Sequence, residues 1–110
     1  MAGTPLDRAL LFDFYAELLT EKQRRYCDLH WNEDYSLAEI AELEGLSRQS
    51  VWDIIRRAEA MLRSFEEKTG IVRRYLEQRA QIQEIRAELL DMLPDNEKAK
   101  ALLQKLEGLI

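Results

Sequence analysis

The sequence predicts an all-α protein with a trihelical helix-turn-helix core followed by long C-terminal helices. The 110 residues include only two prolines and four glycines, too few turn residues for a many-stranded β-protein. Apolar side chains recur at helical spacing along most of the chain. Residues 36–58 carry a small residue, a turn glycine and a β-branched residue at the spacing of a helix-turn-helix.

The first helix is predicted from residue 4 to about Leu19. Thr4 is the expected N-cap, Pro5 suits the first helical position, and Asp7 would lie in the first turn, where the helix dipole favours an anion. A broad apolar stripe recurs every four residues and is expected to face the core. It consists of Leu6, Leu10, Phe14 and Leu18, with Leu11 and Tyr15 beside them.

Two capping boxes predict where the second and third helices begin. Thr20 with Gln23 begins a helix that runs to about residue 31, with Tyr26, Leu29 and either Cys27 or His30 facing inward. Residues 32–35 form a polar linker. Ser36 with Glu39 begins the third helix, and Gly45 is expected to end it in a left-handed conformation. The third helix is expected to bury Leu37, Ile40, Ala41 and Leu43.

The fourth helix is predicted to begin after its cap, Ser47, and to run to about residue 68, where Thr69 and Gly70 end it. Ala41 is small where this helix crosses the third, and Val51 packs into the angle between them. Ile40, Leu46 and Ile54 are expected to fill the same small core.

Two further helices are predicted after a boundary at residue 70, so that residues 1–70 form the helix-turn-helix domain and residues 71–110 a C-terminal helical hairpin. In the helix over 71–93, one heptad series is Tyr75, Ile82 and Leu89, and its companion series is Gln78, Ile85 and Met92. Pro94 breaks the chain before a helix over 96–108. The heptads would either pack on their own domain or pair with a second copy, and we expect a homodimer.

Charge is unevenly distributed in this acidic chain, whose formal net charge is −5. Residues 1–46 hold four basic and ten acidic side chains, a net of −6, whereas residues 47–110 hold twelve basic and eleven acidic, a net of +1. A dedicated nonspecific nucleic-acid binder is normally basic. Any anion-binding surface is therefore expected after residue 46.

Several classes of function are not expected. One cysteine, Cys27, and one histidine, His30, supply neither a disulfide framework nor a metal site. No apolar run is long enough to span a membrane, and no signal peptide is recognisable. Cys27 has no base beside it, and no glycine loop for phosphate is present. We therefore expect a cytoplasmic protein that is not an enzyme and uses no cofactor.

The N-terminal turn of the fourth helix is the candidate nucleic-acid site, because this part of a helix-turn-helix enters the major groove. Arg48 and Gln49 are residue types that read guanine and adenine edges, and Arg56, Arg57 and Arg63 would contact phosphates. Ser47, Trp52 and Asp53 are expected on the same outward side.

Two residues of this site have alternative roles. Asp53 would either repel phosphates or accept a hydrogen bond from a cytosine amine. Trp52 would either stack on a base or a partner, or cover the angle between the helices.

Residues around this motif resemble two known families. The segment LLTEKQRRYCDLHWNEDYSLAEIAELEGLSRQSVWDIIRRAEAML resembles region four of bacterial sigma factors. Residues 8–70 more closely resemble the YlxM family, through FDFY, LLTEKQR, DYSLAEIAE, SRQSVWD and an RRAEAML-type continuation, whereas residues 94–110 are less typical. The resemblance implies a DNA-binding regulator whose recognition segment maps onto Ser47, Arg48, Gln49, Ser50, Trp52 and Asp53.

The YlxM resemblance also implies a role near protein targeting, because genes of this family neighbour those of the signal recognition particle GTPases. We therefore expect a nucleic-acid-binding regulatory protein whose ligand is DNA or the RNA of the particle. The alternative is a protein-interaction adaptor of the targeting machinery, whose acidic first half meets a basic partner such as a targeting GTPase.

Overall fold

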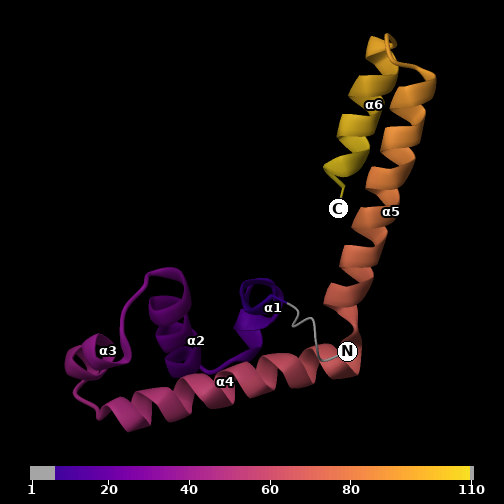
Figure 1. The fold of residues 1–110 in the computed structure, drawn as a ribbon. Helices are drawn as coiled ribbons and strands as arrows, with labels where there is room; N and C mark the ends of the chain where they lie inside the picture. The colour runs from indigo at the N-terminus through magenta and orange to yellow at the C-terminus, as the bar shows by residue number, and fades with distance from the viewer. Residues whose placement is uncertain (1–6, 110) are drawn as a thin grey trace. The chain divides into compact units, whose positions relative to one another are not determined.

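The computed structural model describes residues 7–109, and these contain six α-helices and no strand (Figure 1). They fall into two compact units, residues 1–70 and residues 71–110. The all-α prediction is confirmed. Thr4, Pro5 and Leu6 lie outside the described residues.

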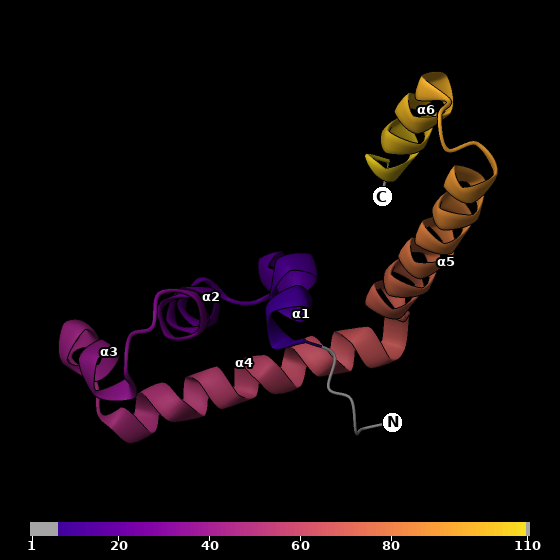
Figure 2. The ribbon, with the colours of Figure 1, turned by 45° about the horizontal axis from the view of Figure 1, so that its top comes forward.

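The first unit contains four helices around one core. They are α1 (Arg8–Tyr15), α2 (Glu21–Cys27), α3 (Leu37–Glu44) and the long α4 (Arg48–Thr69). A 3-10 turn, Ala16–Leu18, follows α1, and a π-helical turn, Asp28–Asn32, extends α2. Figures 1 and 2 show α1, α2 and α3 in sequence along one side of α4, and each of the three packs on α4. The helix α4 is therefore the element that the other three helices of this unit share as a packing partner.

Helix α1 buries a different stripe from the one predicted. Leu11 and Tyr15 are buried, as are Phe12 and Leu19, whereas Phe14 is 40% and Leu18 60% exposed. Asp7 is the N-cap of the helix, not part of its first turn, and its side chain accepts a hydrogen bond from the N–H of Ala9. The helix ends at Tyr15, four residues before the predicted end, because a 3-10 turn replaces its last turn.

Both predicted capping boxes are confirmed. The Thr20 hydroxyl accepts from the N–H of Gln23 at 3.1 Å while the Gln23 side chain accepts from the N–H of Thr20 at 3.0 Å. Ser36 and Glu39 make the same reciprocal pair at 3.0 and 2.8 Å. These bonds satisfy N–H groups that have no partner within the helix, so they fix where α2 and α3 begin.

The angle between α3 and α4 has the predicted helix-turn-helix packing. Ile40 and Val51 are fully buried, and Ala41 is 5% exposed, which lets the two helices approach closely. Leu46 and Ile54 are half-buried at the edge of this small core. Leu43 is 55% exposed, so the prediction that it is buried was wrong. It lies about 60° round α3 from Ile40, on the flank away from Ala41 and beyond the edge of the buried face.

Gly45 ends α3 with φ of 70° and ψ of 33°, as predicted for a left-handed cap. Its N–H donates to the carbonyl of Ala41, as does the N–H of Leu46 at 2.9 Å. A Cβ added at Gly45 would have no atom within 4 Å. The glycine is therefore required by the backbone conformation alone.

We expect Gly45→Ala to destabilise the first unit by about 1 kcal/mol, the cost of a left-handed conformation for a residue with a Cβ. Gly45→Asn should cost less, because asparagine tolerates this conformation. Urea unfolding followed by tryptophan fluorescence measures both, since the two tryptophans, Trp31 and Trp52, lie in this unit. Equal stability of the glycine and alanine forms would contradict the assigned turn.

The second unit is a helical hairpin formed by α5 (Ile71–Met92) and α6 (Glu97–Glu107). Asn96 caps α6 by accepting from the N–H of Ala99 at 2.9 Å. Figures 1 and 2 show the two helices antiparallel and side by side, with the break at Pro94 in the turn between them. Leu103 is buried, and the first heptad series, Tyr75, Ile82 and Leu89, is half-buried. In the companion series, Ile85 and Met92 are at least half exposed.

Candidate nucleic-acid interface

The start of α4 is set by a local hydrogen-bonded cap. The Ser47 hydroxyl accepts from the N–H of Ser50 at 3.0 Å and donates to the Ser50 hydroxyl at 2.9 Å. Serine is favoured here because its short side chain reaches the free N–H groups of the first turn. The first amide groups of a helix have no acceptor within the helix, so the amides of Arg48 and Gln49 make this end attractive to phosphate.

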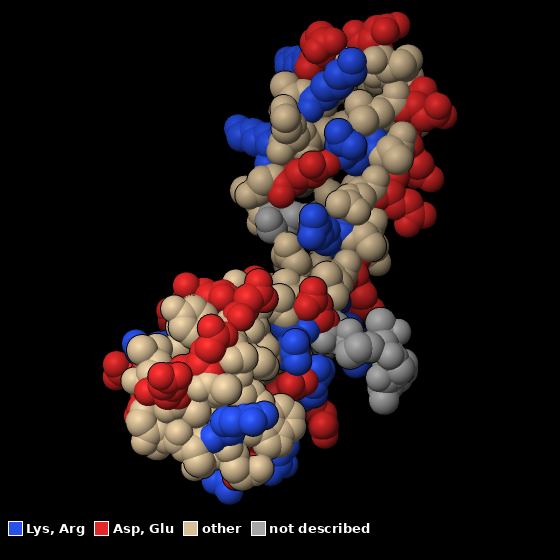
Figure 3. All heavy atoms as spheres, turned by 60° about the vertical axis from the view of Figure 1, so that its left-hand side comes forward, with Lys and Arg blue, Asp and Glu red and all other residues tan. Residues whose placement is uncertain are grey.

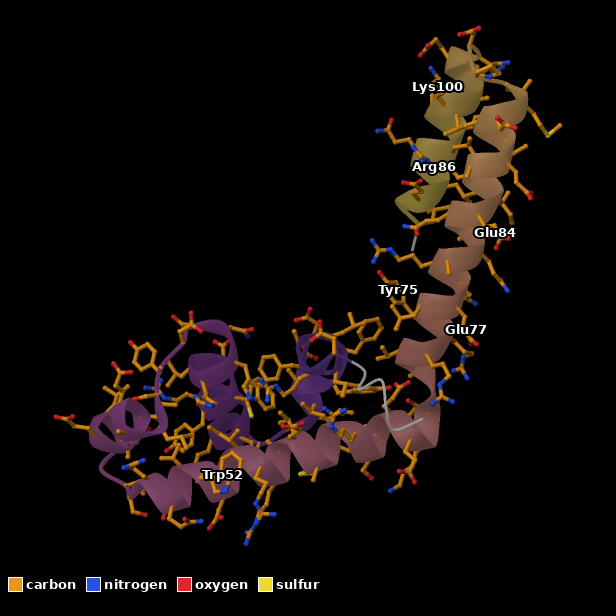
Figure 4. The ribbon with its side chains drawn as sticks, viewed as in Figure 1. Trp52, Tyr75, Glu77, Glu84, Arg86 and Lys100 are labelled. Carbon is orange, nitrogen blue, oxygen red and sulfur yellow. The ribbon has the colours of Figure 1, made fainter. Side chains whose placement is uncertain are left out.

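The predicted site residues lie outside the stripe of residues that α4 buries. That helix buries Val51, Ile55, Ala58, Leu62 and Glu66. Six of the nine candidates are exposed, namely Ser47, Arg48, Gln49, Trp52, Arg56 and Arg57, and the other three, Ser50, Asp53 and Arg63, are half-buried. Figure 4 labels Trp52 on this part of α4, and 43% of its surface is exposed. Gln49, Asp53 and Arg56 lie on the outermost side of α4, whereas Arg48 and Arg57, nine residues apart, lie on its two opposite flanks.

Asp53 connects two of the candidate residues. The Gln49 side-chain amide donates to Asp53 Oδ1 at 3.0 Å, and an Arg56 guanidinium nitrogen lies 3.8 Å from the same oxygen. The aspartate charge is therefore offset by Arg56 and fixes the direction of Gln49. Sequence reasoning missed this cluster, although the i, i+4 and i, i+3 spacings of its members indicate it.

The arginines of this unit differ in whether they already have a partner. Arg63 donates two hydrogen bonds to Glu59, at 3.2 and 2.8 Å, and Arg25 is paired with Glu44 at 2.9 Å. Within residues 7–109, Arg48 and Arg57 form no ion pair. An incoming phosphate would therefore break no ion pair at Arg48 or Arg57, whereas at Arg63 it would compete with Glu59.

Charge on the first unit is segregated. Figure 3 shows acidic side chains gathered on the upper part of this unit and basic side chains along its lower edge, where α4 runs. Residues 47–64 contain four arginines against Asp53 and Glu59, a net charge of +2. The segment that carries the candidate residues therefore has a net positive charge within an acidic unit.

The surroundings of Cys27 and His30 are those of residues with a structural role. Burial raises the pKa of the Cys27 thiol to about 12, with Glu59 adding to the shift and Arg8 opposing it, so the thiol stays protonated at neutral pH. His30 Nδ1 lies 2.7 Å from the carbonyl oxygen of Tyr35, which joins the π-helical turn to the start of α3. Among residues 7–109, no three His, Cys, Asp or Glu side chains are grouped as metal ligands would be. None of the helices described has the length and apolarity needed to cross a membrane.

Comparison with known proteins gives a match over nearly the whole chain. A family model described as UPF0122, "Putative helix-turn-helix protein, YlxM / p13 like", matches residues 5–107, so the match includes most of the C-terminal segment that is less typical by motif. A UPF0122 protein of Halalkalibacterium halodurans is 45% identical over 94% of this chain and 98% of its own length. UPF0122 proteins of Geobacillus kaustophilus and Oceanobacillus iheyensis are 44% and 46% identical, each over 90% of both chains.

Proposed function

Because the chain belongs to the UPF0122 family of YlxM / p13-like helix-turn-helix proteins, we propose that it is a nucleic-acid-binding regulatory protein. The proposed binding surface is the exposed part of α4 from Ser47 to Arg57. The observation that carries the proposal is the exposure of Arg48 and Gln49 at the N-terminus of α4, with Arg57 exposed about two and a half turns farther along the same helix.

Each group of residues on this binding surface has a distinct proposed role. Arg48 and Gln49 contact base edges, and Arg56 and Arg57 contact phosphates about two turns farther along the helix. Trp52 lies between these groups with its ring partly in solvent, where it stacks on a base or on the sugar-phosphate backbone. Asp53 holds Gln49 and Arg56 in place before the ligand arrives.

The proposed ligand is a duplex, either DNA or the RNA of the signal recognition particle. The YlxM resemblance supports the second choice through its gene neighbourhood. In an RNA duplex the shallow minor groove is recognised mainly through its shape and phosphates, whereas the wide major groove of DNA admits a helix. Competition between a random DNA duplex pool and the particle RNA for labelled protein distinguishes the two ligands.

Substitutions on α4 test the site. We expect Arg48→Ala, Arg56→Ala and Arg57→Ala each to weaken binding about five- to tenfold, and binding by the unaltered chain to fall steeply with salt, since released counterions drive phosphate contacts. Mobility shift or fluorescence anisotropy with both ligands measures this. Arg24→Ala, an exposed arginine on α2, is the control with the same charge loss. A loss with Arg24→Ala alone would move the contact to α2, and no loss in any variant would reject the site.

A second candidate function is a protein-interaction adaptor of the targeting machinery. The observation that favours it is the excess of acidic side chains in residues 1–46, four basic against ten acidic, which suits a basic partner such as a targeting GTPase. Co-purification of the GTPases with the tagged chain before and after nuclease treatment separates the two functions. A complex that survives nuclease and is unaffected by Arg48→Ala would support the adaptor.

We also propose that the chain acts as a homodimer through residues 71–110. Two copies would present two α4 helices to one ligand, which is how helix-turn-helix proteins match paired half-sites. Support comes from the companion heptad series of α5, in which Ile85 and Met92 are 50% and 73% exposed in the single chain.

A further inference from the structure

The α5–α6 hairpin has one polar side. Arg86 on α5 pairs with Glu107 on α6 across the junction of the two helices. A small hollow beside this pair is lined by Tyr75, Arg79, Gln83 and Glu107. This side of the hairpin is therefore polar, and its Arg86–Glu107 ion pair is formed within the unit.

The opposite side is apolar. On α5, Ile85 and Met92 lie two turns apart and are 50% and 73% exposed. On α6 and the turn that follows it, a stripe at i, i+4 and i+7 spacing is also exposed: Leu102 is 58%, Leu106 39% and Leu109 79% exposed. At 3.6 residues per turn, both stripes lie about a quarter turn from the line of contact between the helices, away from Arg86 and Glu107. The two stripes thus form one surface, the apolar face, built from both helices.

The two edges of the apolar face carry opposite charge. Along α5 the edge is acidic, because Glu77, Glu84, Glu88 and Asp91 follow one another at intervals of seven, four and three residues. Figure 4 shows Glu77 and Glu84 on the side of α5 away from α6, and Figure 3 shows a row of acidic side chains along one edge of this unit. Along α6 the edge is basic, with the exposed Lys98 and Lys105 seven residues apart.

We infer that the apolar face binds a second copy of this chain, with α5 of each copy packed antiparallel on α6 of the other in a four-helix bundle. The inference rests on the homodimer of the proposed function and specifies its interface. An isologous contact must be complementary to itself. A twofold axis parallel to the helices places the acidic edge of each copy on the basic edge of the other. A twofold axis across the helices would bring the two acidic edges together and is disfavoured.

The spacing of the charges fits this arrangement. Asp91 and Glu84 are seven residues apart, as are Lys98 and Lys105, and at 1.5 Å per residue both intervals are about 10 Å. Asp91 and Lys98 both lie close to the turn at Pro94. A twofold axis along the hairpin keeps these levels, so Asp91 faces Lys98 of the partner subunit, and Glu84 and Glu88 face Lys105 of the partner subunit.

Charge exchange between copies tests the interface. We expect Glu84→Lys/Glu88→Lys and Lys98→Glu/Lys105→Glu each to weaken the homodimer at least tenfold, because each change places like charges across the interface. Mixing the two variants should restore a dimer, since both edges are then complementary again. Sedimentation equilibrium over a concentration series measures the three dissociation constants. Lys100→Glu, on the polar side of α6, is the matched control and should leave the dimer unchanged.

Two further measurements decide the remaining outcomes. Leu102→Gln/Leu106→Gln should abolish the dimer while circular dichroism shows unchanged helix content, and a dimer that persists overturns the apolar face as the interface. A dimer that strengthens with salt and is unaffected by Glu84→Lys/Glu88→Lys overturns the edge pairing. A monomeric unaltered chain that binds nucleic acid through Arg48 overturns this inference but leaves the binding function. A dimer with the expected charge behaviour that binds no nucleic acid supports the inference and rejects that function.

Discussion

Leu62→Ala is expected to destabilise the first unit by about 2–5 kcal/mol, the range for removing a fully buried leucine side chain from a packed core. Leu62 is fully buried on α4, the helix on which α1, α2 and α3 all pack. Removing the end of this side chain leaves a cavity, and the helices packed on α4 can move only partly to fill it. Because a small domain has a total stability of only about 5–15 kcal/mol, the variant should lie close to unfolding at 37 °C.

Urea unfolding followed by tryptophan fluorescence measures the Leu62 effect, since both tryptophans belong to the first unit. Leu18→Ala is the matched control, because it removes the same atoms from a side chain that is 60% exposed. It should change the free energy of unfolding by no more than about 0.5 kcal/mol. Similar losses in the two variants would contradict the core described here.

Ala41→Leu is expected to destabilise the same unit by about 1–3 kcal/mol, the cost of adding methylene groups to a packed site. Ala41 is 5% exposed where α3 crosses α4, and its carbonyl oxygen accepts two hydrogen bonds from the turn that follows α3. A larger side chain would push α3 away from α4 and move the start of α4, which carries Arg48 and Gln49. We therefore expect nucleic-acid binding to weaken as well.

The control for Ala41→Leu is Ala38→Leu on the exposed side of the same helix. It adds the same atoms at a position open to solvent and should leave both unfolding and binding nearly unchanged. Urea unfolding and fluorescence anisotropy of the two variants, measured side by side, separate a packing effect from a change in helix propensity. A stable Ala41→Leu protein would mean that α3 and α4 do not approach closely at this point.

Much of the helix-turn-helix could be predicted from the sequence because its signals are local. The capping boxes at Thr20 and Ser36 and the cap at Ser47 each depend on groups within three residues, and Gly45 is required by its own φ angle. Such signals place the starts of α2, α3 and α4 and the end of α3 without knowledge of any distant contact.

Predictions of burial were less successful because they depend on neighbours far away in the sequence. In α1, Phe14 and Leu18 recur every four residues, but so do Leu11, Tyr15 and Leu19, and spacing does not distinguish the two stripes. The position of α4 decides between them and buries the second. Leu43 was misjudged for the same reason, since the buried face of α3 is centred between Ile40 and Ala41 and leaves Leu43 in solvent.

The sequence by itself determined the helical class, the turn at Gly45 and the set of residues around the start of α4, since caps, turns and helical periodicity act over a few residues. Only the tertiary structure decided which apolar stripe each helix buries, and that the α5–α6 hairpin has an apolar face with oppositely charged edges. The physical reason is that burial depends on contacts between segments far apart in the chain. The local spacing of apolar residues does not reveal which distant segment will pack against which side of a helix.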